Sequence, residues 1–458
     1  MGAFIRRVHF VGIGGVGMSG IAEVLHNLGY RISGSDLKES EITRRLRASG
    51  IKVFRGHAAA HARGAQVLVI SSAVDGSNPE LAWARRARVP VILRAQMLAE
   101  LGRLKKTVTV AGSHGKTTTT SMAAMALKAA GAEPTMIIGG QLKNIRSNVK
   151  LGLGEYMVAE ADESDGSFLH LSPLAAVVTN IDNDHLDFHK SMANLKRAFL
   201  DHLQRLPFYG AAVLCADDPV LASLTAQIGR PVISYGIKNP ARWQAKRIRL
   251  ERGASTFEAH FDGRREAVVR LRVPGRHNVL NALAAMAVGR FLGFEPGRLA
   301  RGLGEFRGVG RRLDRLGTAA GIEFIDDYGH HPTEIATTLE AVCSLWKRKR
   351  VLVVFQPHRY TRTKMLAREF GAAFRGAHFV YVTEIYAAGE KPLPGVSSRL
   401  ILESLKSQGV ACAAYNGALD VARQMRSGDV VLTLGAGDVW KIGEDLLRRA
   451  QSNLTSPA

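Results

Sequence analysis

The sequence predicts an α/β protein with three consecutive domains and mostly parallel sheets. Apolar, strand-like runs alternate with amphipathic helical stretches almost throughout, which is the pattern of βαβ units. At 458 residues the chain is too long for one ordinary core. Two segments rich in basic residues, GRLKK at 102–106 and RGVGRRLDRLG at 307–317, separate the chain into three blocks.

Each block repeats the same rhythm of strand and helix. The first contains the strand-like runs RRVHFVGI, RISGSD and QVLVISSAV and fades near Leu101. The second opens with TVTVAG and continues through MVAEADES, AAVVTNID, a β-like stretch at 245–273 and the helical HNVLNALAAMAVGRFLG. The third contains GIEFIDD, RVLVVFQ, HFVYVTE and DVVLTLGAG, and we expect the final QSNLTSPA to be frayed.

The composition is that of an ordinary globular protein. Hydrophobic residues make up 46% and charged residues 22%, which argues against a disordered chain. The N-terminal MGAFIRRVHFVGIGG is interrupted by glycines, so it fits a first strand better than a signal peptide. No apolar run is long enough to cross a bilayer. Because Cys215, Cys343 and Cys412 lie far apart, without metal or disulfide spacing, we expect a cytoplasmic protein.

The net charge is unusually positive. Sixty-two Lys and Arg against 40 Asp and Glu leave +22, a balance that favours anionic partners. The basic residues are dispersed in pairs, and the densest cluster is KRKR at 347–350. Because no nucleic-acid module accompanies them, the charge predicts attraction to anions and no specific nucleic acid.

The most specific motif is VTVAGSHGKTTTTSMAAMALKAAG, from Val108 to Gly131. A strand, a glycine-rich turn and a helix follow one another, so backbone N–H groups can close around phosphate oxygens at the helix N-terminus. Lys116 would then reach the β- and γ-phosphates of ATP, and the Thr117 hydroxyl would meet Mg²⁺. Val110 stands where a full P-loop has its first glycine, and the alternative is a plain glycine turn with a solvated lysine.

A second glycine motif lies near the N-terminus. Gly12, Gly14 and Gly17 follow a strand and open a helix, and Asp36 ends the next strand, which is the G-x-G-x-x-G pattern with its downstream acid. The pattern indicates that a pyrophosphate group meets a helix N-terminus. The NAD of a dehydrogenase and a sugar nucleotide both satisfy it. Because a separate ATP loop follows, a nucleotide-linked substrate is favoured.

Acidic segments follow two further strands of the central block. EADESD, at 160–165, follows one apolar run, and NIDNDHLD, at 180–187, follows another. Parallel sheets bind ligands at the carboxyl ends of their strands, and carboxylates beside a phosphate loop favour Mg²⁺. His185 is a metal-ligand candidate. Asp162 and Asp165 fit a solvated loop and a metal site equally well.

Four other polar residues are weaker candidates. Asn278 and Asn281 share one face of a helix that begins after Pro274-Gly275. Either Asn278 caps this helix or both amides bind a nucleotide. Arg312 and Asp327 flank the start of the third block, where neither residue type is distinctive.

Together these segments resemble the Mur ligase family. The matching strings occur in family order and span nearly the whole chain: GIGGVGMSGIAEVL, SGSD, AGSHGKTTTT, EADESDGSFL, NIDNDHLDF, PGRHNVLNALAA, GVGRR, DDYGHHPTE, FQPHRYTRT, YAAGE and GAGD. The resemblance implies an N-terminal Rossmann-like domain for a UDP-linked substrate (1–104), a central P-loop ATPase domain (105–311) and a C-terminal Rossmann-like domain for an amino acid (312–458).

The resemblance also implies an activity. We expect ATP- and Mg²⁺-dependent joining of L-alanine to the carboxylate of UDP-N-acetylmuramic acid through an acyl phosphate, in cell-wall precursor synthesis, by a monomer or homodimer. The alternatives are a recycling ligase that adds a tripeptide to the same sugar nucleotide, a dehydrogenase, and an ATPase that acts on nucleic acid. No base for the amine is identified, though His185 or His330 could serve.

Roles for single residues follow from the same resemblance. The catalytic residues would be Lys116, Glu160, His185 and Arg312. The metal ligands would be Thr117, Glu160 and His185. The ATP-binding residues would be Gly112, Ser113, His114, Gly115, Lys116, Thr117, Thr118, Asn278, Asn281, Arg312 and Asp327. The residues for the other two substrates would be Gly14, Gly15, Gly17, Asp36, Ser71, Ser72, His330, His358, Arg359 and Arg362.

Departures from the family pattern are few. Ser113 replaces a threonine usual in the loop, and Phe188 stands where an aromatic hydroxyl is common. No lysine matches the modified, metal-bridging lysine of related ligases, so we predict no such modification. His331, which precedes Pro332, is expected to begin a helix and not to act in catalysis.

Overall fold

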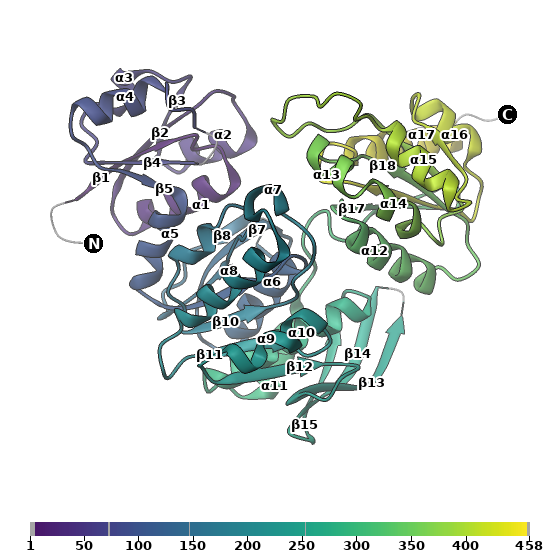
Figure 1. The fold of residues 1–458 in the computed structure, drawn as a ribbon, viewed down its shortest axis with the longest axis horizontal. Coiled ribbons are helices and arrows are strands. Elements are labelled where there is room, and N and C mark those ends of the chain that lie inside the picture. The colour runs from purple at the N-terminus through teal and green to yellow at the C-terminus, as the bar shows by residue number, and fades with distance from the viewer. Residues whose placement is uncertain (1–4, 72–73, 146, 252, 456–458) are drawn as a thin grey trace. The chain divides into compact units, whose positions relative to one another are not determined.

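The computed structural model describes residues 5–71, 74–145, 147–251 and 253–455 (Figure 1). The chain forms two compact units. The first comprises Met1–Arg249, Ser255–Val273 and Asn278–Arg307, and the second comprises Leu250–Ala254, Pro274–His277 and Gly308–Ala458. The first unit contains two sheets and the second contains one. The predicted α/β fold with three mostly parallel sheets is therefore confirmed.

The N-terminal sheet has five parallel strands in the order β3-β2-β1-β4-β5. Its strands are β1 (Arg7–Val11), β2 (Arg31–Asp36), β3 (Lys52–Arg55), β4 (Val67–Ile70) and β5 (Val91–Leu93). The helices are α1 (Val16–Asn27), α2 (Glu41–Ala48), α3 (Ala59–Ala62), α4 (Pro79–Arg86) and α5 (Arg94–Arg103). Because β1 lies between β2 and β4, the glycine loop after β1 lies at the point where the strand order reverses, where open α/β sheets bind ligands.

The central sheet has ten strands in the order β15-β14-β13-β12-β11-β10-β6-β9-β7-β8. The strands are β6 (Lys106–Ala111), β7 (Thr135–Leu142), β8 (Ser147–Lys150), β9 (Tyr156–Glu160), β10 (Ala175–Val178), β11 (Ala211–Cys215), β12 (Val232–Gly236), β13 (Trp243–Glu251), β14 (Ala254–Phe261) and β15 (Arg264–Leu271). The helices are α6 (Lys116–Ala129), α7 (Leu186–His189), α8 (Met192–Gln204), α9 (Pro219–Leu224), α10 (Arg276–Phe291) and α11 (Pro296–Glu305), with 3₁₀ turns η1 (Ser167–His170) and η2 (Thr225–Gln227).

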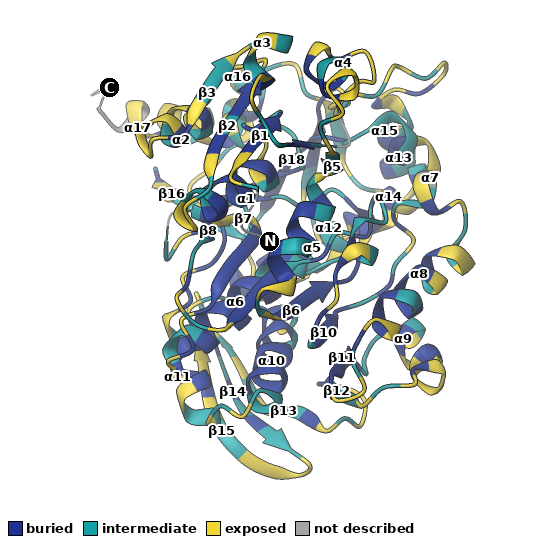
Figure 2. Cartoon of the chain, turned by 90° about the vertical axis from the view of Figure 1, so that its left-hand side faces the viewer, coloured by how far each residue is buried: buried dark blue, intermediate teal, exposed yellow. Residues whose placement is uncertain are grey.

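The middle of this sheet positions the candidate site. Strand β6 pairs in parallel with β9 on one side and β10 on the other, so the carboxyl ends of these three strands meet at one edge. Helices α6 and α10 are buried along most of their length, as Figure 2 shows. The pairs β7–β8 and β14–β15 are antiparallel and extend the sheet at its two ends.

The third sheet has the order β16-β17-β21-β18-β19-β20, with only the β16–β17 pair antiparallel. Its strands are β16 (Asp314–Ala319), β17 (Ile322–Asp327), β18 (Val351–Phe355), β19 (Phe379–Val382), β20 (Cys412–Ala414) and β21 (Val430–Leu434). The helices are α12 (Pro332–Leu345), α13 (Tyr360–Met365), α14 (Ala367–Ala373), α15 (Arg399–Ser407), α16 (Ala418–Gln424) and α17 (Trp440–Thr455).

The third sheet is covered on both faces. Val353 and Phe355 of β18 pack into one apolar cluster and Val354 into another, as the two-residue period of a strand requires. Helix α17 continues to Thr455, so the expectation that the whole tail is frayed was wrong for 451–455. Among the described residues, no helix is long and apolar enough to cross a membrane.

Candidate active site

The phosphate loop joins β6 to α6 in a conformation that needs its glycines. Gly112 and Gly115 have φ values of +129° and +81°, and Gly115 is the N-cap of α6. A Cβ on Gly112 would overlap the Thr179 hydroxyl and lie 2.9 Å from the Thr179 backbone nitrogen. The loop therefore has the strand–glycine–helix geometry that the sequence predicted.

Residues after β10 hold the loop in place. Asn180 accepts a hydrogen bond from the His114 N–H at 2.9 Å and donates to the His114 carbonyl at 3.0 Å. The Thr179 hydroxyl donates to the same carbonyl, and the Asp182 N–H donates to the Ser113 hydroxyl at 2.9 Å. Part of the NIDND segment thus supports the phosphate loop.

Lys116 is paired with a buried acid. Its Nζ donates to Glu163 Oε1 and to the Gly112 carbonyl, each at 2.7 Å. The Glu163 side chain is fully buried, whereas that of Lys116 is 13% exposed. Burial alone would lower the pKa of Lys116, but attraction by Glu163, Asp162 and Glu160 outweighs it and raises the pKa, so the lysine stays charged. Burial raises the pKa of Glu163 to about 7 against the attraction of Lys116.

The other acids of 160–165 make local contacts. Glu160 ends β9, and its Oε2 accepts from the Gly139 N–H at 2.8 Å. Asp162 and Asp165 each accept from the N–H two residues later, at 3.0 Å, which shapes the turns of the loop. Burial would raise the pKa of Asp162, yet the nearby Lys116 and the Ser164 N–H lower it. The metal role of Glu160 stays a prediction.

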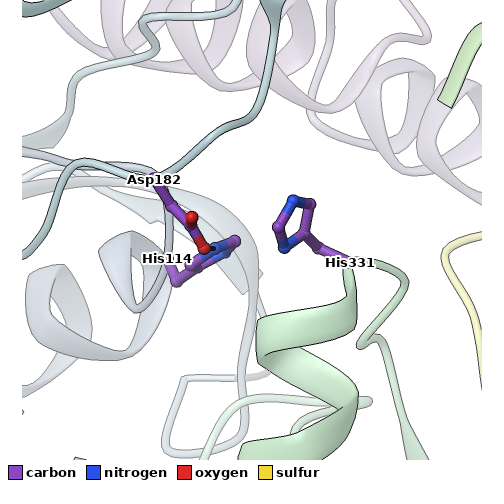
Figure 3. A group of neighbouring side chains, drawn as sticks. All are labelled: His114, Asp182 and His331. Atoms are coloured by element: carbon purple, nitrogen blue, oxygen red, sulfur yellow. Dashed lines mark hydrogen bonds and ion pairs between the residues drawn. The ribbon is translucent and has the colours of Figure 1, made fainter. Parts of the chain in front are cut away.

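His185 lies beside the buried acid. Its Nε2 is 3.8 Å from Glu163 Oε1 and 3.4 Å from Asp184 Oδ2, and its φ of +57° places it in the left-handed region just before α7. The structure therefore brings His185, Glu163 and Lys116 together. The segment that precedes His185 also contacts the phosphate loop through a side chain. His114 Nε2 donates to Asp182 Oδ2 at 2.9 Å, and Figure 3 shows these two residues.

The two helical asparagines lie inside α10. Asn281 Oδ1 accepts from the Thr119 hydroxyl at 3.0 Å and lies 3.1 Å from the position of a Cβ on Gly115. The Asn281 amide also donates to Asn278 Oδ1 at 3.4 Å. Asn278 is the third residue of the helix and not its cap. Asn281 therefore supports the start of α6, and contact with ATP stays a prediction for both residues.

The N-terminal glycine loop is tied to β2. The Gly12 and Ile13 N–H groups donate to the Ser35 carbonyl at 2.8 and 3.0 Å, and the Gly14 N–H donates to Asp36 Oδ2 at 2.9 Å. Gly15 is the N-cap of α1. Ser71 Oγ lies 3.7 Å from the position of a Cβ on Gly12.

The structure therefore brings the predicted residues of the sugar-nucleotide site together, although Ser72 lies outside the described residues. Gly17 has close contact with the Arg94 guanidinium, which would lie 2.8 Å from a Cβ at that position.

In the C-terminal unit, Asp327 binds the segment before β16 and the loop after β17. Its carboxylate accepts from the Leu313 and Gly329 N–H groups, both at 2.7 Å, and from the Thr338 hydroxyl at 3.2 Å. Burial raises the pKa of Asp327 to about 6 although Arg312 opposes the shift. Arg312 lies over the Tyr328 ring at 5.0 Å. The predicted ribose contact of Asp327 and the phosphate contact of Arg312 stay predictions.

The predicted amino-acid residues form one group in this unit. The rings of His330 and His358 lie 5.4 Å apart, and Arg362 Nη1 lies 3.2 Å from His358 Nδ1. Arg359 donates its N–H to the Tyr386 carbonyl at 2.8 Å, and its φ is +70°. His331 caps α12 by accepting from the Thr333 N–H at 3.3 Å, as expected for a residue before Pro332.

Sequence reasoning did not assign three residues that the structure places at these sites. Glu163 was named only as part of the acidic segment, and nothing in the pattern distinguished it from Glu160 as the partner of Lys116. Thr179 carries no motif. Arg94 could have been found, because it follows the fifth strand at the same carboxyl edge as the glycine loop.

Comparisons with known proteins agree with this arrangement. The chain matches the Mur ligase family, catalytic domain at residues 7–106, the Mur ligase middle domain at 110–289 and the Mur ligase, glutamate ligase domain at 311–437. It is 50% identical to a UDP-N-acetylmuramate–L-alanine ligase of Endomicrobium trichonymphae over 96% of this chain and 98% of that protein. It is 52% identical to the ligase of the same name from Syntrophotalea carbinolica, over 96% and 97%.

Solved structures give the same result for the fold. A UDP-N-acetylmuramate-alanine ligase from Thermotoga maritima matches with a TM-score of 0.81 and 32% identity, over 98% of this chain and 99% of that one. A murein peptide ligase from Psychrobacter arcticus matches with a TM-score of 0.71 at 23% identity over 98% and 99%, a level that supports the fold alone.

Proposed function

The chain belongs to the Mur ligase family, and from this premise we propose that it joins L-alanine to the carboxylate of UDP-N-acetylmuramic acid. The reaction cleaves ATP to ADP and phosphate and yields a peptidoglycan precursor. The observation that carries the ATP chemistry is the charged Lys116 at the start of α6, held between the glycine loop and Glu163. The near full-length similarity to alanine ligases supports the choice of substrates.

The loop is suited to bind transferable phosphate. The N-terminus of α6 offers N–H groups and positive potential, and Lys116 adds a full charge. An oxygen of the muramyl carboxylate attacks the γ-phosphorus, the bond to the ADP oxygen breaks, and an acyl phosphate forms. Lys116 stabilises the charge that develops on the transferred group. We propose that Arg312 adds a second positive charge.

The residues near the loop fit Mg²⁺. Among the residues that the structure describes, Glu163 Oε2 is buried without a hydrogen-bond partner, and the nearby Asp162 carboxylate contributes to the raised pKa of Glu163. Such oxygens are the ligands that Mg²⁺ prefers. We propose that Thr117, Glu160 and His185 hold the ion, with Glu163 close by. When bound, Mg²⁺ would neutralise charge on the phosphates.

The second half of the reaction belongs to the C-terminal unit in this proposal. The neutral amine of L-alanine attacks the acyl carbon, and phosphate leaves from the tetrahedral intermediate. Arg362 lies beside His358, whose ring is near that of His330, and Arg359 follows His358 in the chain. A guanidinium matches the two oxygens of a free α-carboxylate. We assign the amino acid to this group of side chains.

We also propose the domain limits 1–104, 105–311 and 312–458, which place one sheet in each domain. A cytoplasmic location agrees with three free cysteines and with nucleotide substrates. The oligomeric state, monomer or homodimer, stays a prediction.

The test is ADP release in the presence of UDP-N-acetylmuramic acid and Mg²⁺. Three reactions are compared, with no amino acid, with L-alanine, and with the cell-wall tripeptide. Turnover that requires L-alanine supports the proposal. Turnover only with the tripeptide would assign the chain to the recycling branch, and bound nicotinamide would support a dehydrogenase. Omission of Mg²⁺, with EDTA present, should abolish ADP release.

A further inference from the structure

A buried acid lies in the N-terminal domain, away from the phosphate loop. Glu80, in the first turn of α4, is fully buried and is surrounded by three histidines. Its carboxylate oxygens lie 3.6 Å from His9 Nε2, 3.5 Å from His57 Nδ1 and 3.3 Å from His61 Nδ1. These imidazoles come from β1, from the segment after β3 and from α3. We call this group of four side chains the Glu80 cluster.

The charge of Glu80 is compensated from several elements. The Ser35 hydroxyl of β2 donates to Oε2 at 2.6 Å, and the Ala58 N–H donates to Oε1 at 3.3 Å. Burial would raise the pKa of Glu80, but the interactions with His9 and Ser35 outweigh it and lower the pKa. Burial of a carboxylate costs free energy unless the carboxylate is paired and hydrogen-bonded. The groups that contact Glu80 are therefore held in positions where they can bind it.

Ser35 connects the cluster to the glycine loop. Its hydroxyl is bound by Glu80 and lies 2.9 Å from His57 Nδ1, while its carbonyl accepts the N–H groups of Gly12 and Ile13. The next residue, Asp36, accepts the Gly14 N–H. A displacement of β2 at Ser35 would therefore move three hydrogen bonds that shape the loop.

The Glu80 carboxylate also restrains the segment at 56–58, which follows β3 at the carboxyl edge of the N-terminal sheet. The Asp36 carbonyl accepts from the Gly56 N–H at 2.8 Å, and the following residues, His57 and Ala58, contact the Glu80 carboxylate. The His61 ring is fixed further by stacking on Phe54, with ring centroids 4.3 Å apart. Both segments at the carboxyl edge of the sheet thus depend on one side chain.

A metal site is a poor explanation of the cluster. Among the residues that the structure describes, these side chains do not bring three ligand atoms within 4.8 Å of one another.

We propose that Glu80 is a positioning residue for the sugar-nucleotide substrate, acting through Ser35 on the glycine loop and through His57 on the segment at 56–58. The inference rests on the proposed function, because it takes the glycine loop as the site of the UDP-linked substrate. Glu80 does not touch the substrate in this account. It fixes the backbone groups that do.

The experiment compares Glu80→Gln with the full-length wild-type protein. Glutamine keeps the size of the side chain but removes its charge. We expect the KM for UDP-N-acetylmuramic acid to rise about ten-fold or more, as occurs at metal sites when a residue that orients the ligands is removed. The kcat and the KM for ATP should stay within about two-fold. Glu39→Gln is the matched control, because Glu39 is in the same domain and its ion pair with Arg47 is exposed.

Direct binding gives a second readout that a merely structural role would not move. Calorimetry measures the Kd for UDP-N-acetylmuramic acid, and in Glu80→Gln this Kd should rise by about the same factor as the KM. A variant that only loses stability would keep the Kd and the KM of the wild-type protein as long as it is folded.

The outcomes separate the inference from the proposed function. Ser35→Ala, which leaves the backbone carbonyl in place, should raise the KM for UDP-N-acetylmuramic acid by a smaller factor. It tests the same inference if Glu80→Gln does not fold. A lower melting temperature with an unchanged KM and an unchanged Kd for UDP-N-acetylmuramic acid in both variants would overturn the inference. Absence of turnover in the wild-type protein would instead overturn the proposed function.

Discussion

The phosphate loop illustrates how little freedom single residues have at this site. Gly112 faces Thr179 so closely that a Cβ cannot be placed there, and Asn180 holds the His114 peptide from both sides. The Lys116 ammonium group is held in place by Glu163 and the Gly112 carbonyl, which both accept hydrogen bonds from it. Loop shape and lysine position thus depend on residues outside the motif, Thr179, Asn180 and Glu163, as well as on its own glycines.

Gly112→Ala tests the contact with Thr179. We expect a loss of at least about 3 kcal/mol in unfolding free energy, or a loop distorted enough to lower kcat/KM about 100-fold or more, because overpacking and positive φ combine. Gly131→Ala is the control, since Gly131 has a φ of +89° but open space around it. It should cost only about 1–2 kcal/mol. Urea unfolding and ADP release measure the two effects, and equal costs would contradict the role of Thr179.

Lys116→Met tests the ion pair. It should abolish turnover and also destabilise the protein by about 1–3 kcal/mol, because Glu163 would stay buried without its partner and would have to be protonated. The double variant Lys116→Met with Glu163→Gln should recover most of the stability and none of the turnover. Thermal unfolding separates the two effects. If the single variant were as stable as the wild type, the pair would have no energetic significance.

The sequence predicted the strand, the glycine turn and the helix of this loop, because such a turn requires particular residue types in consecutive positions. It did not predict the partner of Lys116. Glu160 and Glu163 are both glutamates after the same strand, and only the turn at 162–165 decides which one reaches the lysine. Such a choice depends on backbone geometry that no local pattern contains.

Among the elements, α8 anchors the acidic segment to the sheet. His202 of α8 is fully buried, with Nδ1 3.1 Å from the Phe168 carbonyl and Nε2 3.1 Å from the Thr109 hydroxyl. Its ring also stacks on Phe168. Because Phe168 donates its N–H to the Asp162 carbonyl, α8 fixes the end of the loop that carries Glu163.

This anchor predicts a sensitivity to acid. Burial lowers the pKa of His202 to about 4 from about 6.5. Between these values the unfolded chain binds the extra proton, so stability falls as the pH drops from 6.5 to 4, by a total on the order of 3 kcal/mol. His202→Gln should lose less stability between pH 7 and pH 4.5 than the wild type in urea unfolding. The exposed His170→Gln should behave as wild type, and parallel pH profiles for all three proteins would contradict the assignment.

Helices and strands with a strong periodic pattern were predictable from the sequence. The side-chain contacts that hold them together were not. The strands before the glycine loops and the helix at 276–291 follow from apolar runs and turn residues in the sequence. The burial of His9 and His202 does not, because a histidine on an apolar face looks the same whether or not an acid or a carbonyl from a distant element meets it. Long-range pairs such as Glu80 with Ser35 require the fold.

For the whole molecule, the charge of +22 calls for a test of its own. We expect duplex DNA to bind with a Kd of roughly 10⁻⁴ to 10⁻⁶ M and a steep dependence on salt, because dispersed basic residues attract any polyanion. ADP release should not be stimulated by DNA at 150 mM salt. Poly-glutamate, a polyanion that is not a nucleic acid, is the control in the same assay of ADP release. Stimulation by DNA and not by poly-glutamate would favour the nucleic-acid ATPase.

The pairing of Lys116 with Glu163 has a consequence for inhibitors. A compound that mimics the phosphates of ATP must displace a carboxylate that the protein already supplies, so part of its attraction to the lysine is spent on that exchange. A neutral compound that leaves the pair intact would avoid this competition. Compounds that meet Lys116 and Glu163 through neutral groups are therefore expected to lose less affinity to this exchange than phosphate mimics.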